Sequence, residues 1–315
     1  MPVNTVLGPV AADALGQTLV HEHVSGADWS LRAAFGTRFY DHDVILERAT
    51  KHLTRAREAG VRTIVDGTPI NLGRDVALLR EVAEHTGLTV VASTGFYYTE
   101  HPYLQWRAEA EVASWLDREC TDGIADTGIR PGIMKAACAG AGLTPQLHNV
   151  FRAIGAVAAS HDLPIFVHHE VEAANGQAIV DLFDETGVAP GRLIVGHCGD
   201  SNDLDYLQAL LDRGVYLGMD RFGYCSVGNS LENRVATIVA LAQRGYAAQL
   251  LLAHDLAVYF GVFGSWEDFV ERDPLEDGVD FTFIHTRVIP ALVAAGLDQT
   301  TARAMLTDNP RALFG

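Results

Sequence analysis

The sequence is poor in cysteine, in basic residues and in long apolar runs, and each shortage argues against a class of protein. Its 315 residues include four cysteines and no Cys-x-x-Cys pair, which argues against a disulfide framework and predicts buried, reduced thiols. The 23 lysines and arginines against 40 aspartates and glutamates give a net charge of −17, which argues against nucleic-acid and anionic-membrane partners. No apolar run approaches the roughly 18 residues of a membrane span, and no signal-peptide pattern opens the chain. We expect a cytoplasmic protein.

The chain also lacks a glycine-rich phosphate turn after its first expected strand, and this absence bears on the fold. Short β-branched runs alternate with helical patterns in units of roughly 30 residues, which is typical of a (β/α)8 barrel. An open doubly wound sheet is the alternative, but it would usually carry the missing turn. We therefore expect an α/β protein with a single (β/α)8 barrel domain over residues 1–315. Its strands are expected at 16–24, 61–66, 88–93, 132–135, 163–168, 192–197, 215–220 and 249–255.

Capping residues predict where several helices begin and end. Asp41 is expected to cap a helix that Gly60 closes. Thr144 followed by Pro145 has the N-cap and first-turn pattern of another helix. Residues 103–120 carry apolar side chains along one stripe and are expected to form one continuous helix.

Histidines stand at the ends of several expected strands, where the working face of such a barrel lies. His21 and His23 are two residues apart in a strand, so both side chains point to one face and their imidazoles could hold one metal ion. The ordinary alternative is two polar residues where the strand runs into a loop. Further strand ends carry Lys135, His168 followed by His169, His197, and His254 followed by Asp255. Each alone is explained as a loop-facing polar residue, but together they favour a metal site.

The candidate ligands suit two divalent metal ions. Imidazole nitrogens with a carboxylate favour zinc, with cobalt, iron or manganese as alternatives. Two neighbouring ions need a bridging ligand, and a bridging water whose pKa falls to about 7 would supply a hydroxide nucleophile. Lys135 cannot bind a cation as an ammonium group, but a neutral amine that adds CO₂ becomes a carbamate with two oxygens. The alternative for Lys135 is an ion pair at the end of a strand.

With these residues laid out, the chain resembles the phosphotriesterase family of the amidohydrolase superfamily, and within it the phosphotriesterase-like lactonases. The resemblance rests on TVLGP at residues 5–9, GQTLVHEH at 16–23 and TDNPR at 307–311. It therefore spans nearly the whole chain. The second of these segments is far more specific than a His-x-His pattern alone.

The resemblance implies a role for each candidate ligand. The metal ligands it implies are His21, His23 and Asp255 for a buried ion, His168 and His197 for a more exposed ion, and an N6-carboxylated Lys135 as the bridge. Asp255 would also accept the proton of the bridging hydroxide. The family's strand pattern assigns the ligand to His168 rather than His169, and it places His254 behind the site. Glu22 points away from its histidine neighbours and is expected to support the site from below, and the family suggests a homodimer.

Two positions bear on the substrate. Arg221 stands where true phosphotriesterases resemble one another in having a histidine, and Tyr97 stands where lactonases have a tyrosine near the bridging hydroxide. Both positions favour a lactonase, with N-acyl-homoserine lactones, the substrates of quorum-quenching enzymes, ahead of plain γ- and δ-lactones. The alternatives are a phosphotriesterase of the same fold, or triester hydrolysis as a weak side reaction. A metal-bound protein without catalysis is the alternative from another class, and the presence of Asp255 and Lys135 argues against it.

The chain departs from the better-known lactonases after Asp255, and a long irregular stretch is expected at 256–278. Five apolar or aromatic side chains are expected to form a channel for an acyl chain: Tyr98, Phe222, Val258, Phe263 and Trp266. The alternative is a small satellite core, which aromatic residues on long loops form as often. Arg221 is expected to orient the ring substituent or the loop that follows it. An ion pair of Arg221 with Asp200 or Asp220 is the alternative.

Overall fold

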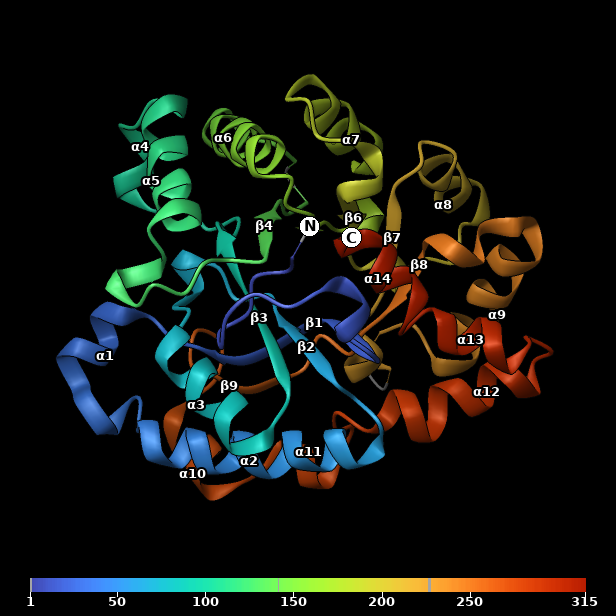
Figure 1. Ribbon diagram of the computed structural model, residues 1–315, viewed down its shortest axis with the longest axis horizontal. Coiled ribbons are helices and arrows are strands. Elements are labelled where there is room, and N and C mark those ends of the chain that lie inside the picture. Colours follow the sequence, from blue (N-terminus) through green and yellow to red (C-terminus); the bar gives the residue numbers. More distant parts are fainter. Residues whose placement is uncertain (1, 141, 226–227) are drawn as a thin grey trace.

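A curled sheet of parallel strands forms the centre of the computed structural model, which describes residues 2–140, 142–225 and 228–315 (Figure 1). Strands β1 to β8 pair in chain order, each parallel to the next, and β9 pairs with the other edge of β1. The strands in the described part of the chain are β1 (Thr18–Gly26), β2 (Thr63–Asp66), β3 (Thr89–Gly95), β4 (Ile133–Ala137), β5 (Ile165–His168), β6 (Leu193–Val195), β7 (Tyr216–Met219), β8 (Leu250–Leu252) and β9 (Ala257–Phe260). This α/β order is that of a TIM-like barrel.

The two ends of the sheet meet at β1. Beyond the end of β8, the backbone N–H of Asp255 donates to the carbonyl of His21, and the N–H of His23 donates to the carbonyl of Leu256. All eight predicted strands are present. Several are shorter than predicted, most clearly β6 and β8, which are three residues long. The prediction of an irregular stretch at 256–278 is wrong at Trp266–Glu271 and Pro274–Asp277, which form short helices, and at 257–260, where β9 lies against β1. This strand depends on a partner that is far away in the sequence, so no local pattern indicates it.

Helices cover the outside of the sheet (Figure 1). Those in the described residues are α1 (Trp29–Phe35), α2 (His42–Ala59), α3 (Val76–Thr86), α4 (Pro102–Gln105), α5 (Glu109–Thr121), α6 (Pro145–His161), α7 (Gly176–Glu185), α8 (Leu204–Leu211), α9 (Leu231–Leu241), α10 (Trp266–Glu271), α11 (Pro274–Asp277), α12 (Ile289–Ala294), α13 (Gln299–Ala304) and α14 (Asp308–Phe314). Short 3-10 and π segments occupy several of the connections.

Capping explains the helix boundaries that the sequence predicted correctly. The Asp41 carboxylate accepts from the first backbone N–H groups of α2, and Gly60 follows the last turn with φ at +121°. The Thr144 hydroxyl accepts from the N–H of Leu147 at the start of α6. The prediction of one helix over 103–120 is wrong, because that stretch contains two helices, α4 and α5, separated at residues 106–108.

The strand alternation places one set of side chains inside the barrel. The strand residues of a buried cluster there come from β1 to β6 and from β8: Val20, Val65, Val91, Ile133, Phe166, Ile194 and Leu251. A larger buried cluster fills the space between the sheet and the helices. Because side chains two residues apart share a face of a strand, the residue two positions beyond Ile133 or Phe166 also faces the interior, at the carboxyl end.

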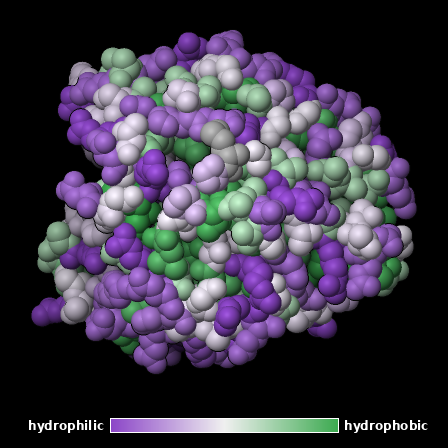
Figure 2. Space-filling view, in the orientation of Figure 1, coloured by the Kyte–Doolittle hydropathy of each residue, from purple (hydrophilic) through white to green (hydrophobic). Residues whose placement is uncertain are grey.

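The polarity of the surface and the burial of the cysteines match what the composition predicted. Figure 2 shows polar and charged side chains over most of one face, with hydrophobic side chains gathered near its centre. Cys120, Cys138 and Cys198 are buried and Cys225 is half-buried, and all four are free. No helix in the described part of the chain combines the length and the apolar character that a membrane span needs.

Candidate metal centre and active site

The carboxyl ends of β1, β4 and β8 bring four predicted ligands together. Lys135 Nζ lies 2.7 Å from His21 Nε2, and His23 Nε2 lies 3.3 Å from Asp255 Oδ1. One ligand atom each of His21, His23 and Asp255 lies within 4.8 Å of the others. His21 and Lys135 are each 1% exposed, whereas the side chains of His23 and Asp255 are 7% and 13% exposed. The four side chains, taken from three strands, therefore converge on one buried point.

The ends of β5 and β6 carry the other two predicted ligands. His168 lies two residues beyond Phe166 and faces the same interior, and its Nδ1 lies 2.7 Å from His197 Nε2. His169 points away, with Nδ1 2.5 Å from the Gly196 carbonyl and Nε2 3.1 Å from the Tyr206 hydroxyl. The structure therefore brings His168 to the centre and leaves His169 outside it.

Asp220, at the end of β7, holds two of these histidines in place. Its carboxylate oxygens lie 3.0 Å from His21 Nδ1 and 3.1 Å from His197 Nδ1, and the residue is fully buried. Thr68 Oγ1 lies 2.8 Å from His23 Nδ1 in the same way. Hydrogen bonds at Nδ1 leave Nε2 free for a metal ion. From the sequence, Asp220 was expected only as a possible ion-pair partner of Arg221. Its position at the end of an expected strand is the sequence signal for this other role.

The residues present fit a pair of divalent ions. Burial and the neighbouring Lys135 lower the pKa of His21 to about 3, and burial lowers the pKa values of His168 and His197 well below their usual range. These imidazoles are therefore neutral at pH 7 and present lone pairs, as ligands must. Burial also lowers the pKa of Lys135 to about 8, so a sizeable fraction of its amine is neutral near that pH.

Asp255 and Arg221 form an ion pair at the mouth of the centre. Arg221 Nε lies 3.3 Å from Asp255 Oδ2, and Arg221 Nη1 lies 2.8 Å from Asp200 Oδ2. Burial alone would raise the pKa of Asp255, but the surrounding histidines hold it well below its usual range, so the carboxylate is ionised. Asp200 also accepts from the fully buried guanidinium of Arg234. The ion pair of Arg221 with Asp200 is thus present, and Asp220 takes no part in it among the described contacts.

The backbone at three of these strand ends is strained. His197, Arg221 and Asp255 have φ values of 60°, 61° and 59°, in the left-handed region that side chains other than glycine rarely adopt. Such conformations persist where the surroundings hold them, and they gather at functional sites. Here each turn directs its side chain over the carboxyl end of the barrel.

Tyr97 lies beside the histidine pair. Its ring centroid is 5.1 Å from that of His168, and its side chain is 9% exposed. Burial raises the pKa of the Tyr97 hydroxyl, so this group stays protonated and can donate a hydrogen bond. Asn71 fixes the backbone here, because its Oδ1 accepts from the N–H of Tyr97.

Glu22 and His254 lie behind the ligands. Glu22 Oε1 lies 2.8 Å from His254 Nδ1 and accepts from the backbone N–H of His254, and Glu22 Oε2 accepts from the N–H of Leu256. Because Glu22 stands between His21 and His23 in β1, this buried contact ties the chain beyond β8 to the strand that carries two ligands.

A cavity of about 1380 Å³ opens over the centre. Its polar end is lined by His21, His23, Tyr97, Lys135, His168, Arg221 and Asp255. Its apolar wall includes Leu72, Val258, Phe260, Phe263, Phe269 and Leu275. Most of this wall comes from residues 256–279, the segment that follows the ligand Asp255. One cavity thus combines five of the six candidate metal ligands with a large apolar surface.

Comparison with known proteins identifies the group to which this site belongs. The sequence model of the phosphotriesterase family matches residues 1–314. The chain belongs to the phosphotriesterase family. It is 36% identical to a phosphotriesterase homology protein of Mycobacterium tuberculosis, over 99% of this chain and 97% of that protein.

Other relatives of this chain have names that refer to different substrates. The chain is 28% identical to an aryldialkylphosphatase of Saccharolobus solfataricus, over 95% of each chain. It is 25% identical to an N-acetyltaurine hydrolase of Rattus norvegicus, over 98% of this chain and 96% of that protein. The chain is therefore a phosphotriesterase-family hydrolase, and its substrate has to be argued from its own site.

The residues predicted for an acyl channel are divided between the cavity and the core. Val258 and Phe263 line the cavity of this phosphotriesterase-family protein, whereas Phe222 is fully buried in the main core. The ring of Trp266 packs 5.3 Å from the rings of Tyr259 and Phe269, which belong to the main buried cluster. Tyr98 is half-buried with its ring 4.2 Å from that of Tyr97, and it is not part of the cavity wall in the described structure.

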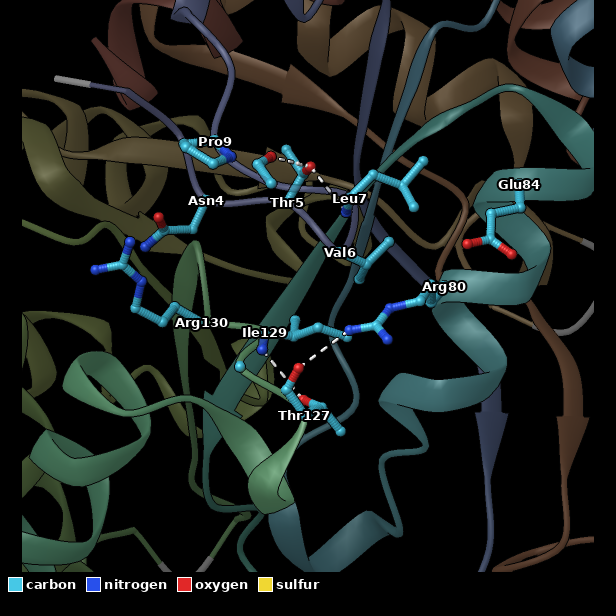
Figure 3. Close-up of a pocket in the computed structure, with 12 residues that line it drawn as sticks. Asn4, Thr5, Val6, Leu7, Pro9, Arg80, Glu84, Thr127, Ile129 and Arg130 are labelled. Carbon is cyan, nitrogen blue, oxygen red and sulfur yellow. Dashed lines mark hydrogen bonds between the residues drawn. The ribbon is translucent and has the colours of Figure 1, made fainter.

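A second cavity, of about 410 Å³, contains none of the predicted site residues (Figure 3). It lies between the N-terminal turn and the connections before β3 and β4, where the N–H of Val6 donates to the carbonyl of Val90. Arg80 lines it and donates to the carbonyl of Thr127 (Figure 3). Active sites of TIM-like barrels lie at the carboxyl ends of the strands, so this cavity is at the wrong end for catalysis.

Proposed function

We propose that this phosphotriesterase-family hydrolase is a binuclear metal-dependent lactonase, with N-acyl-homoserine lactones as its leading substrate class. One observation carries the proposal. The same cavity is lined by five of the six candidate metal ligands (all but His197), a protonated tyrosine, an arginine paired with an aspartate, and an apolar wall. A substrate with a polar ring and an apolar chain matches both ends of this cavity.

The metal ligands proposed are His21, His23 and Asp255 for one ion, His168 and His197 for the other, and an N6-carboxylated Lys135 between them. Zinc suits this set best, and cobalt, iron and manganese are the alternatives. When bound, such a pair supplies a Lewis acid for the carbonyl and a hydroxide nucleophile at neutral pH. The lowered pKa of Lys135 supports carboxylation, because the neutral amine is the form that adds CO₂.

Asp255 is the proposed proton carrier. Its ionised carboxylate can accept the nucleophile's proton as the carbonyl carbon is attacked. It then returns the proton to the ring oxygen as the ester bond breaks, so that water is added across the bond and a hydroxy acid results. Arg221 holds the second carboxylate oxygen of Asp255 and keeps the first directed toward His21 and His23.

Tyr97 and the apolar wall are the proposed substrate contacts. The Tyr97 hydroxyl can donate to the carbonyl oxygen as negative charge develops there, which lowers the barrier to attack. The cavity volume of about 1380 Å³ exceeds the ~300–1,000 Å³ typical of small-molecule sites, and it leaves room for an acyl chain beside Val258 and Phe263. We propose Phe222, Tyr98 and Trp266 as supports behind this wall rather than as contacts.

Phosphotriester hydrolysis is the second candidate function. It is favoured by the relative named aryldialkylphosphatase, which matches over 95% of this chain. The same ligands and the same Asp255 would serve attack on phosphorus. A homodimer that acts in the cytoplasm on a small molecule remains our prediction for the assembly and location.

The test compares three substrates on one preparation of known metal content. We expect nearly two ions per chain, and a higher kcat/KM for an N-acyl-homoserine lactone than for an unsubstituted γ-lactone or an aryl dialkyl phosphate. One ion per chain would refute the binuclear proposal, and a dominant triester rate would refute the lactone assignment. Asp255→Asn should lower kcat by roughly 100- to 10,000-fold for the true substrate.

A further inference from the structure

Most of the apolar wall of the active-site cavity comes from one segment, residues 257–280, and the two halves of this segment are held in different ways. The first half is β9, whose backbone pairs with β1 so that Ala257 lies opposite His23 and Phe260 opposite Gly26. The Phe260 ring also lies 5.3 Å from that of His23. Backbone pairing with β1, the strand that carries two proposed metal ligands, fixes this half. Its position therefore does not depend on the side-chain contacts of the second half.

The second half contains the short helices α10 and α11, which lie along α2 (Figure 1). Arg48 of α2 donates to the carbonyls of Phe269, Val270 and Arg272, with Nη2 3.0 Å from the Val270 oxygen and Nη1 3.1 Å from the Arg272 oxygen. Its guanidinium carbon also lies 4.2 Å from the centre of the Phe269 ring. The last carbonyls of a helix have no partner within it and carry partial negative charge. Arg48 therefore caps α10 from a neighbouring helix.

Three more basic residues of α2 continue this contact along α11. The ion pairs of Lys51 and Arg55 are Lys51 Nζ to Glu276 at 2.7 Å, Arg55 Nη1 to Glu276 at 3.1 Å and Arg55 Nη2 to Asp280 at 2.9 Å. His52 Nε2 lies within hydrogen-bond distance of Asp273, at 2.8 Å. The basic residues recur at intervals of three and four, which places them on one face of α2. Their acidic partners recur at similar intervals in the segment, so the two faces match in charge and spacing.

We propose that Arg48, Lys51, His52 and Arg55, here called the α2 basic stripe, determine substrate specificity. They do so by fixing the half of the wall that contains Phe269 and Leu275, here called the distal wall. Phe269 and Leu275 of the anchored half line the cavity, whereas the stripe lies outside it. The stripe therefore acts on the substrate through the wall, as a set of positioning residues. This inference rests on the proposed function for the nature of the substrate: a long acyl chain reaches the distal wall, and a short one does not.

The structure predicts which kinetic constant responds to loss of the stripe. No stripe residue contacts a candidate metal ligand among the described contacts, so the chemical step is expected to keep its rate. Loosening the anchored half removes ordered apolar surface from the site that a long chain occupies. KM for the long substrate should rise while KM for the short one stays the same.

The test uses Arg48→Met and the double variant Lys51→Met/Arg55→Met, with Arg57→Met as the matched control. Arg57 lies on the same helix, is exposed, and makes no described hydrogen bond or ion pair with residues 257–280. Hydrogen exchange of 257–280 measures the anchoring, and a melting temperature measures the global fold. Kinetics with butanoyl- and dodecanoyl-homoserine lactone then give the ratio of the two KM values, and binding of the matching N-acyl lactams gives a ratio of Kd values without turnover.

We expect faster exchange in 257–280 and a roughly 10-fold rise in the dodecanoyl KM and Kd for Arg48→Met, a change of about 1.4 kcal/mol. The butanoyl values and the Arg57→Met protein should match the wild type. Unchanged exchange, or an unchanged ratio despite faster exchange, would overturn the inference. A wild-type protein that binds the lactams but does not hydrolyse the lactones would refute the proposed reaction. The ratio of the dodecanoyl to the butanoyl lactam Kd would then decide whether the α2 basic stripe sets specificity. A wild-type protein that binds neither the lactams nor the lactones would refute the proposed substrate class. It would also refute the inference about acyl-chain length.

Discussion

Asp220→Asn is the sharpest test of how the candidate metal centre is held. The Asp220 carboxylate accepts at both oxygens, 3.0 Å from His21 Nδ1 and 3.1 Å from His197 Nδ1. An asparagine has nearly the same shape but one accepting oxygen and one donating NH₂ group. One of the two histidines must then lose its partner at Nδ1 or change its tautomer, which would place a hydrogen on the Nε2 that faces the centre.

The expected magnitude follows from this geometry. Loss of one such supporting hydrogen bond commonly lowers metal affinity by about 10- to 100-fold. Because the bond is fully buried and Asp220 serves ligands of both proposed ions, we expect the upper end, a loss of about 100-fold or about 2.8 kcal/mol. The backbone should be little disturbed, since the Asp220 carbonyl still accepts from buried Arg234 at 2.7 Å.

The assay is competition of the protein with a chelator of known affinity, followed by metal analysis of the protein fraction. Asp162→Asn is the matched control, because Asp162 forms a two-point ion pair with Arg192 at the opposite end of the barrel. Asp162 has a φ of 51°, a conformation that asparagine tolerates well. The control should retain wild-type metal affinity.

Two results would refute the reasoning. A folded Asp220→Asn protein with wild-type metal affinity would show that the orientation of His21 and His197 does not depend on this carboxylate. An equal loss in Asp162→Asn would show that the effect is a general consequence of a weakened fold. Circular dichroism and a melting temperature on each protein without metal separate these cases.

Three further predictions concern single side chains. Tyr97→Phe should lower kcat by about 10- to 100-fold at unchanged metal content, because a hydrogen-bond donor to the developing oxyanion is lost. Steady-state kinetics combined with metal analysis measures this change, and an unchanged kcat would contradict the prediction. Metal loading of the metal-free protein should become faster with added bicarbonate and slower as the pH falls below about 8, because protonated Lys135 cannot add CO₂. A loading rate that does not depend on bicarbonate would argue against carboxylated Lys135 as the bridging ligand. Burial lowers the pKa of His285 to about 4 in the folded protein, whereas in the unfolded chain it is about 6.5. As the pH falls from about 6.5 to 4, the unfolded chain binds a proton that the folded protein does not, so the protein loses stability. Between these pH values, urea unfolding should show that the free energy of unfolding falls by roughly 2 kcal/mol less in His285→Gln than in the wild type, a figure that allows for the ring's partial exposure. An equal fall in both proteins would contradict the prediction.

Local patterns in the sequence were sufficient to locate most of the elements. Caps such as Asp41 and Thr144 act through hydrogen bonds to residues two or three positions away, so a short window of sequence contains the whole interaction. The break between α4 and α5 was missed because apolar side chains continue at helical spacing across it. Strand β9 was missed because its partner β1 lies at the other end of the chain.

The sequence by itself determined which residues stand at the carboxyl ends of the strands, and therefore which side chains were candidates for the metal centre. Alternation along a strand and the alternation of strands with helices are short-range properties, and they placed His21, Lys135 and His168 on one rim. Only the tertiary structure decided which atoms meet: that Asp220 bridges two histidines, that Arg221 pairs with Asp200 and Asp255, and that α2 holds the cavity wall. The physical reason is that each of these contacts joins segments far apart in the chain, and their geometry exists once the barrel has brought them together.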